Sequence, residues 1–181
     1  MKKIPLIICL FTCSAGIIDI AKCAPIFNPA TGHLYYVVSS GADGSPVNSE
    51  NNAFVLGGNL VTINETAKES WLIANLESRT SFWTGFTDAA VMGTWVWSSD
   101  EPATYINWDK IEPNNMMPPT GEDYAVLNWD TAADQWDDWS FERPEYSQIN
   151  GIAQVIPALA VLLFGSIGVG LVSWLRRSSA F

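Results

Sequence analysis

The sequence predicts an α+β fold in which two helices come first and a tryptophan-rich β portion follows. Three observations lead to this prediction. Short runs of aromatic and β-branched residues at 34–38 and 59–63 are typical of strands. Apolar side chains recur at helical spacing between residues 71 and 76. Tryptophan accounts for 9 of the 181 residues, and most of these lie in short strand-like runs after residue 80.

Strands and helices are expected to alternate in the first half of the folded region. In chain order they are a strand at 34–38, a turn-rich loop at 41–46, a helix at 49–56 and a strand at 59–63. The second helix is expected to begin after Asn64, because asparagine is a favoured N-cap residue. Its apolar stripe comprises Trp71, Leu72, Ile73 and Leu76.

The second half is expected to be mainly β structure. The predicted strands cover residues 81–86, 94–97, 124–129 and 135–136. Large aromatic side chains at strand-like positions are typical of a core. We therefore expect a buried cluster of Trp83, Trp95, Trp97 and Trp108. Residues 107–121 carry three prolines and little regular pattern, which indicates a long loop.

Residues 1–24 are typical of a secretory signal peptide. Two lysines precede an apolar run at 4–12, and small residues follow at two positions that suit cleavage, near Ala15 and near Cys23. An uncleaved anchor is the alternative. All three cysteines lie in this segment, so the exported domain at 25–150 is expected to have no disulfide.

Residues 151–181 are expected to form a C-terminal transmembrane and sorting segment. The 21 residues at 155–175 contain no charged side chain and are enough to span a bilayer as a helix. Arg176 and Arg177 follow, and the positive-inside rule places them in the cytoplasm with the exported domain outside. A buried core helix is the alternative. We therefore expect a cell-surface protein with a membrane anchor.

The same tail resembles the PEP-CTERM class of bacterial sorting signals, although the usual Pro-Glu-Pro motif is absent. The parts that carry the resemblance are Pro157, the glycine-containing apolar run after it and the arginine pair. The resemblance implies an exosortase-like enzyme that cuts the tail and releases the domain to the extracellular matrix or re-anchors it. Without such processing, the tail would be a permanent anchor.

The charge balance excludes some functions. The chain has 19 acidic and 9 basic residues and a net charge of −10, which argues against nucleic-acid binding. Because 48% of its residues are hydrophobic and 15% are charged, it is not a disordered acidic tail. Between residues 25 and 150 there are 18 acidic and 4 basic residues. Such an excess of acid either keeps the surface solvated or serves a cation.

Three short stretches predict a calcium site. They are Glu112-Pro113-Asn114, Gly121-Glu122-Asp123 and Trp136-Asp137-Asp138. Calcium takes about six to eight oxygen ligands. The candidate ligands are Glu112, Asn114, Glu122, Asp137 and Asp138. A cis bond before Pro113 would let Glu112 and Asn114 turn toward one ion. Zinc is disfavoured because the chain has a single histidine; acidic loops without an ion are the alternative.

In this order, the three stretches resemble those of the C-type lectin-like domain. The resemblance runs from about Tyr36 to Phe141. It includes four further segments, at 58–63, 82–86, 93–100 and 105–108. It implies two helices, small antiparallel sheets and a long calcium-binding loop region. It also implies that the five candidate ligands form the main calcium site, and that Glu112-Pro113-Asn114 directs binding of mannose-type sugars.

Two departures from the family pattern change these expectations. Tyr124 and Phe141 stand where the family has a disulfide, and we interpret the two aromatic residues as a packing substitute. Asp137 stands where the family has asparagine. A carboxylate can bind calcium but cannot donate a hydrogen bond to a sugar hydroxyl, so binding of mannose-type glycans is expected to be weak.

The favoured function is therefore calcium-dependent binding of a glycan or exopolysaccharide by an exported domain. A calcium-stabilised protein–protein adhesion domain is the alternative, because a fold does not fix a function. We expect no enzymatic activity. Glycoside hydrolysis needs one acid with a raised pKa, whereas binding to calcium lowers the pKa of a carboxylate, and the sequence shows no nucleophile–base pair.

Overall fold

The computed structural model describes residues 24–76, 80–116, 121–128, 134–142 and 149–157. The expected signal peptide and nearly all of the expected transmembrane segment lie outside these ranges. Within them, no helix combines the length and the apolar character needed to cross a membrane.

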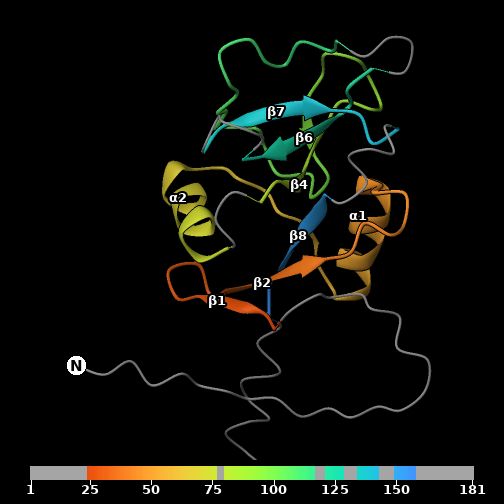
Figure 1. Cartoon of the computed structure of the whole chain (residues 1–181). Coiled ribbons are helices and arrows are strands. Elements are labelled where there is room, and N and C mark those ends of the chain that lie inside the picture. The colour runs from red at the N-terminus through yellow and green to blue at the C-terminus, as the bar shows by residue number, and fades with distance from the viewer. Residues whose placement is uncertain (1–23, 77–79, 117–120, 129–133, 143–148, 158–181) are drawn as a thin grey trace, which may run out of the picture.

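The described chain is an α+β domain, as the sequence predicts (Figure 1). Its elements are β1 (Ile26–Asn28), β2 (His33–Val38), α1 (Pro46–Val55), β3 (Asn59–Leu60), α2 (Thr66–Asn75), β4 (Phe82–Thr87), β5 (Val96–Trp97), β6 (Tyr124–Leu127), β7 (Trp136–Trp139) and β8 (Asn150–Val155). Both predicted helices are present, and each predicted strand has a counterpart. The two helices flank the central strands on opposite sides (Figure 1).

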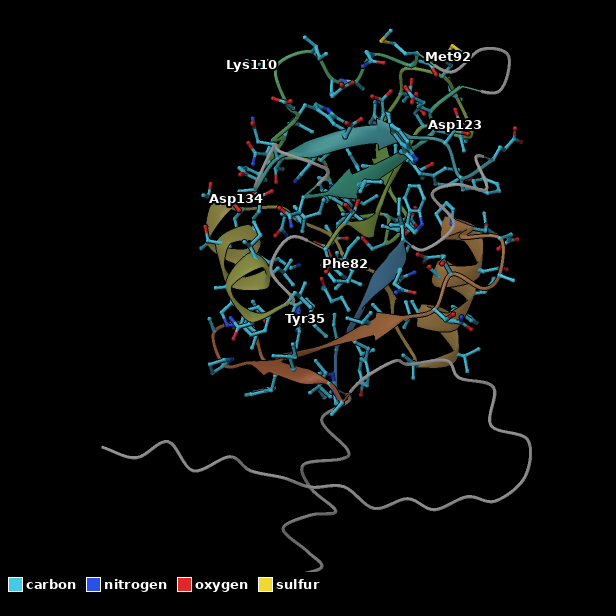
Figure 2. The ribbon with its side chains drawn as sticks, viewed as in Figure 1. Tyr35, Phe82, Met92, Lys110, Asp123 and Asp134 are labelled. Atoms are coloured by element: carbon cyan, nitrogen blue, oxygen red, sulfur yellow. The ribbon has the colours of Figure 1, made fainter. Side chains whose placement is uncertain are left out.

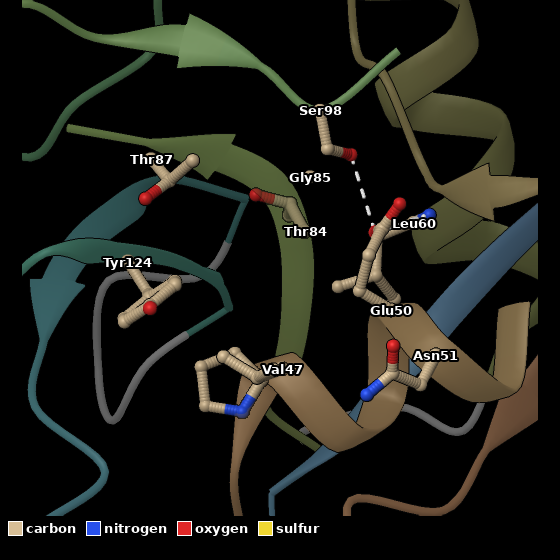
Figure 3. A pocket seen from close by; sticks show the side chains of 10 residues that line it. Val47, Glu50, Asn51, Leu60, Thr84, Gly85, Thr87, Ser98 and Tyr124 are labelled. Carbon is tan, nitrogen blue, oxygen red and sulfur yellow. Dashed lines mark hydrogen bonds between the residues drawn. The ribbon is translucent and has the colours of Figure 1, made fainter. Parts of the chain in front are cut away.

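Helix α1 is fixed at its start and along one face. The Ser45 hydroxyl accepts a hydrogen bond from the Val47 amide at 3.2 Å, and a proline occupies the first turn. The helix therefore begins three residues before the predicted position. Glu50 holds the helix against the sheet, because its carboxylate accepts a hydrogen bond from the Leu60 amide at 2.8 Å. It also accepts one from the Ser98 hydroxyl at 3.2 Å, which Figure 3 marks.

Helix α2 begins at Thr66 with Glu65 in the N-cap position. The prediction that Asn64 caps this helix is therefore wrong. The Asn64 side chain instead donates a hydrogen bond to the Glu101 carboxylate at 3.1 Å. This contact joins the segment before α2 to the loop that follows β5, a pairing between residues 37 positions apart that no local pattern could indicate.

The strands form one sheet in the order β1-β2-β8-β4-β6-β7, with β3 paired to β8 and β5 paired to β4. Along this order the neighbouring pairs are antiparallel, except that β4 and β8 run parallel. Strand β7 lies at one edge of the sheet and the β1–β2 hairpin at the other (Figure 1). The two ends of the described chain lie on either side of β2, because Leu34 pairs with both Phe27 and Val155.

Strand β8 corrects the expected domain boundary. It lies between β2 and β4 in the sheet, so the folded domain extends at least to Val155 rather than ending at residue 150. Residues 151–154 are all buried, and a strand buried on both faces lacks the alternation that identifies strands in a sequence. A Cβ atom at Gly151 would lie 2.7 Å from the Ser49 Cβ, so glycine permits the close approach of α1.

The tryptophan cluster forms the core, as predicted. Trp83 and Trp97 are fully buried, and the two other predicted residues, Trp95 and Trp108, are partly buried against the core. The Phe86 ring lies 4.4 Å from that of Trp97 and 5.6 Å from that of Trp136. Trp136 therefore fixes the start of β7 in the core, immediately before the two adjacent aspartates of this strand.

Candidate functional site

Three of the five predicted ligands lie together. One carboxylate oxygen from each of Glu112, Asp137 and Asp138 lies within 4.8 Å of the other two. Glu112 belongs to the long loop, and the two aspartates belong to β7, which is held in register by β6. We call these three residues the carboxylate cluster. Strand β7 lies toward the end of the molecule where Figure 2 labels Lys110 and Asp123, and Tyr35 lies toward the other end.

Asp138 organises the long loop through its two carboxylate oxygens. Oδ1 accepts a hydrogen bond from the Asn114 amide at 2.9 Å, and Oδ2 accepts one from the Asn115 amide at 2.8 Å. Asp138 is 1% exposed, so these charge-assisted bonds are shielded from water. The Glu112–Pro113 peptide bond at the start of this turn is cis, as the sequence analysis considered. The turn is therefore held directly over β7.

Glu122 connects the two limbs of the loop. Its Oε2 accepts a hydrogen bond from the Met116 amide at 2.7 Å, and its own amide donates to Asn115 Oδ1 at 2.7 Å. Gly121 precedes it with a φ of 79°, and a Cβ atom there would lie 2.8 Å from Asn115 Oδ1. A glycine is therefore required at this position both by conformation and by space.

Asn114 reaches the cluster through its backbone. Its amide donates to Asp138, whereas its side-chain Oδ1 accepts a hydrogen bond from the Met116 amide at 2.9 Å. This is a local Asx turn. The structure thus brings Glu112, Asp137 and Asp138 into one cluster. Glu122 lies close enough to interact electrostatically with Glu112 and Asp137. The Asn114 side-chain oxygen, in contrast, is bonded within its own loop.

The electrostatics of the carboxylate cluster favour a bound cation. Burial, a hydrogen bond to Asp138 and the charges of Asp137, Asp138 and Glu122 together raise the pKa of Glu112 to about 8, with burial as the largest cause. Burial also raises the pKa of Asp137 to about 7, together with the charges of Asp138, Glu122 and Asp109. Packing several carboxylates together in a partly buried site disfavours their ionised forms, and a nearby positive charge reverses this effect.

The donor set suits calcium. Glu112 Oε2 is buried and has no hydrogen-bond partner within the described structure, and a buried oxygen of this kind normally has one. The residues around it supply carboxylate and amide oxygens, which are ligands for hard cations such as calcium. The cluster contains neither histidine nor cysteine, the ligands that zinc would favour.

Two acidic residues that bond to Trp136, at the start of β7, were not predicted from the sequence. Asp109 lies close enough to Asp137 to raise its pKa, because the Asp109 amide bonds to the Trp136 carbonyl at 2.9 Å. Glu69, in α2, is 3% exposed and accepts hydrogen bonds from Trp136 Nε1 at 2.5 Å and the Tyr105 hydroxyl at 2.6 Å. No spacing in the sequence indicated either contact, because both join segments more than 25 residues apart.

The region that carries all five predicted ligands matches a known protein family. The Lectin C-type domain family matches residues 48–146. Lectin BRA-3 of Megabalanus rosa is 34% identical over 82 residues, which cover 45% of this chain and 48% of that protein. The C-type lectin mannose-binding isoform of Oxyuranus scutellatus is 27% identical over 111 residues, which cover 59% of this chain and 68% of that protein. The match therefore spans about half the length of the first relative.

Solved structures share the fold. The human scavenger receptor C-type lectin carbohydrate-recognition domain is 26% identical, with a TM-score of 0.58. The similarity covers 74% of this chain and 98% of that domain. The arrangement of α1, α2 and the sheet therefore agrees with that of a complete carbohydrate-recognition domain.

Proposed function

Because this chain belongs to the C-type lectin domain family, we propose that it binds carbohydrate through a calcium ion held by Glu112, Asn114, Glu122, Asp137 and Asp138. The observation that carries the proposal is the carboxylate cluster, in which three side chains meet within 4.8 Å around a buried, unpartnered Glu112 oxygen. The proposed role is binding, without catalysis.

The predicted ligands would have different roles in the site. Asp138 and Glu122 accept hydrogen bonds from backbone amides of the loop and so fix its shape around the proposed ion. Glu112 supplies the oxygen that has no other partner. When bound, calcium would neutralise the cluster and offer free coordination places to a vicinal diol. The Asn114 amide group could then donate a hydrogen bond to a sugar hydroxyl.

Mannose-type glycans are the proposed ligands. Support comes from the Glu112-Pro113-Asn114 motif and from the similarity to a relative that is named as mannose-binding. Asp137 limits the affinity, because a carboxylate at this position accepts hydrogen bonds but cannot donate one.

A calcium-stabilised protein–protein adhesion domain is the second candidate. The same Asp137 favours it, since the missing donor weakens sugar binding and leaves calcium binding intact. A glycan array probed with and without calcium separates the two functions. Calcium-dependent mannose signals support the lectin, and a calcium-bound protein without glycan signals supports adhesion.

We further propose that the domain acts outside the cell. The N-terminal pattern supports export, and the apolar run at 155–175 supports membrane anchoring with a cytoplasmic C-terminus. An exosortase-like enzyme would then release the domain into an exopolysaccharide matrix. Because β8 ends beside β2, in the half of the sheet away from β7 (Figure 1), an anchored domain would hold its carboxylate cluster away from the membrane.

A further inference from the structure

A polar cavity of about 290 Å³ shares no lining residue with the carboxylate cluster. Its walls come from four separate segments: the β1–β2 hairpin, the start of α2, the loop after β5 and strand β8. The side chains that matter are His33, Asn64, Glu65, Lys68, Glu101 and Gln154. None of them takes part in the proposed calcium site.

Lys68 brings a buried positive charge to this cavity. The residue is 5% exposed, and burial lowers the pKa of its ammonium group, while the charges of Glu101 and Glu65 act in the opposite direction. Both carboxylates act on Lys68 electrostatically, but no ion pair to it is found among the described residues. A buried charge without a paired neighbour is strongly destabilising, so an acceptor inside the cavity would be favourable.

Gln154 brings an unsatisfied acceptor to the same cavity. It is 8% exposed, and its Nε2 lies 3.2 Å from His33 Nδ1. Its Oε1 is buried and has no hydrogen-bond partner among the described residues. Buried amide oxygens are nearly always paired. The lining of the cavity therefore combines the buried positive charge of Lys68 with the carboxylates of Glu65 and Glu101.

We propose that this cavity binds a small zwitterion, of the class of free α-amino acids. The carboxylate of the ligand would pair with Lys68, and its ammonium group would donate to Glu101. The charges of the lining favour such a ligand over simpler ones. Two carboxylates oppose a plain anion, and a plain cation would leave Lys68 unpaired. A volume of about 290 Å³ accommodates only a small molecule.

His33 gives a direct measurement of binding, because it is the only histidine in the chain and lines the cavity. The full chain, in detergent micelles and labelled at histidine, is titrated with glycine and with L-serine while the imidazole resonances are followed by NMR. Acetate and methylammonium, each carrying one half of the zwitterion, are the matched ligand controls. We expect a saturable shift with the amino acids and an apparent affinity at least about tenfold weaker for either control.

Variants assign the shift to the cavity. Lys68→Met and Glu101→Gln should each weaken binding by about tenfold or more, whereas Lys110→Met, at an exposed lysine outside the cavity lining, should leave it unchanged. Thermal melting verifies that each variant is folded; if Lys68→Met is not, Glu101→Gln decides the question. The titration is repeated without calcium and should give the same affinity, which separates this site from the lectin site.

Three results would overturn the proposal. The first is no saturable shift with any amino acid, which would mean that the cavity holds only water. The second is a shift with acetate or methylammonium equal to that with glycine. The third is unchanged binding in both cavity variants.

Discussion

The rings of Tyr124 and Phe141 pack edge to face, with their centroids 5.9 Å apart. The sequence analysis interpreted these two residues as a packing substitute for a disulfide, and the packing is confirmed. Tyr124 also packs edge to face against the fully buried Trp83, at 6.3 Å. The pair joins the start of β6 to the chain just beyond β7, so it closes the end of the hairpin that carries Asp137 and Asp138.

We predict that Tyr124 and Phe141 stabilise the fold as a pair. Aromatic pairs contribute about 0.5–1.5 kcal/mol beyond the area that they bury. A double-mutant cycle with Tyr124→Leu and Phe141→Leu, measured by urea unfolding, should therefore give a coupling free energy of about 1 kcal/mol. Strictly additive effects would show that the two rings stabilise the domain independently.

Calcium should stabilise the protein. A ligand that binds only the native state at a hundredfold excess over its Kd adds about 2.7 kcal/mol to the free energy of unfolding, or about 10 °C in Tm for a domain of this size. Melting with and without calcium measures the gain. Glu112→Gln and Asp138→Asn should reduce it, and Asp100→Asn, at an exposed aspartate outside the cluster, is the control. Equal melting temperatures in both conditions would contradict the site.

The metal-free protein should become less stable as the pH rises from about 5 to 8. The folded-state pKa values of Glu112, about 8, and Asp137, about 7, lie above their ordinary values of 4.5 and 3.8. The folded state therefore retains protons that the unfolded state has already released, so stability is present at low pH and is lost as the pH passes through the folded pKa values.

Calcium should reverse this pH trend, because it competes with those protons. The gain in Tm on adding calcium should be larger at pH 8 than at pH 5.5, and Glu112→Gln should flatten both profiles. Protein stripped of metal beforehand is the correct reference, since chelators titrate in the same range. A metal-free Tm that rises over this pH interval would show that the two carboxylates are not buried together.

Sugar binding should be weak and limited by Asp137. Restoring a donor with Asp137→Asn should strengthen binding to mannose-type glycans several-fold, since a net hydrogen bond contributes about 0.5–1.5 kcal/mol. Asn114→Ala should abolish binding, because it removes the remaining amide donor. Calorimetry with a mannose-type oligosaccharide measures both changes, with Asp100→Asn as the control. Binding that survives calcium removal, or is lost in Asp137→Asn, would contradict this mechanism.

Strand β8 should decide which truncated forms fold. A chain ending after Pro157 retains β8 between β2 and β4 and should be a folded, secreted domain, whereas a chain ending after Asn150 loses most of this strand and should be degraded or aggregate. Fractionation in high salt and a cooperative melt test both forms. Membrane association of the form ending after Pro157 would contradict the proposed anchor, and a cooperative melt of the form ending after Asn150 would contradict the role of β8.

Local patterns in the sequence determined much of the molecule. The two helices, the short strands and the tryptophan core each follow from spacing and side-chain size within about ten residues. The candidate ligands were also identifiable, because calcium requires oxygen-bearing side chains and these are concentrated in three short stretches. Such features can be predicted without knowing which distant segments of the chain are in contact.

Only the tertiary structure decided the remaining features, because they depend on contacts between distant segments. Strand β8 could not be recognised from the sequence. Because it is buried on both faces, its residues do not alternate between apolar and polar, and they look like the start of the apolar C-terminal segment. Glu69 reads as a surface residue of a helix, yet in the fold it accepts hydrogen bonds from Trp136 and Tyr105. Likewise, the cavity between Lys68 and Gln154 exists because the start of α2 faces the end of β8. Each of these three features is determined by packing between distant segments, which the periodicity of the sequence does not encode.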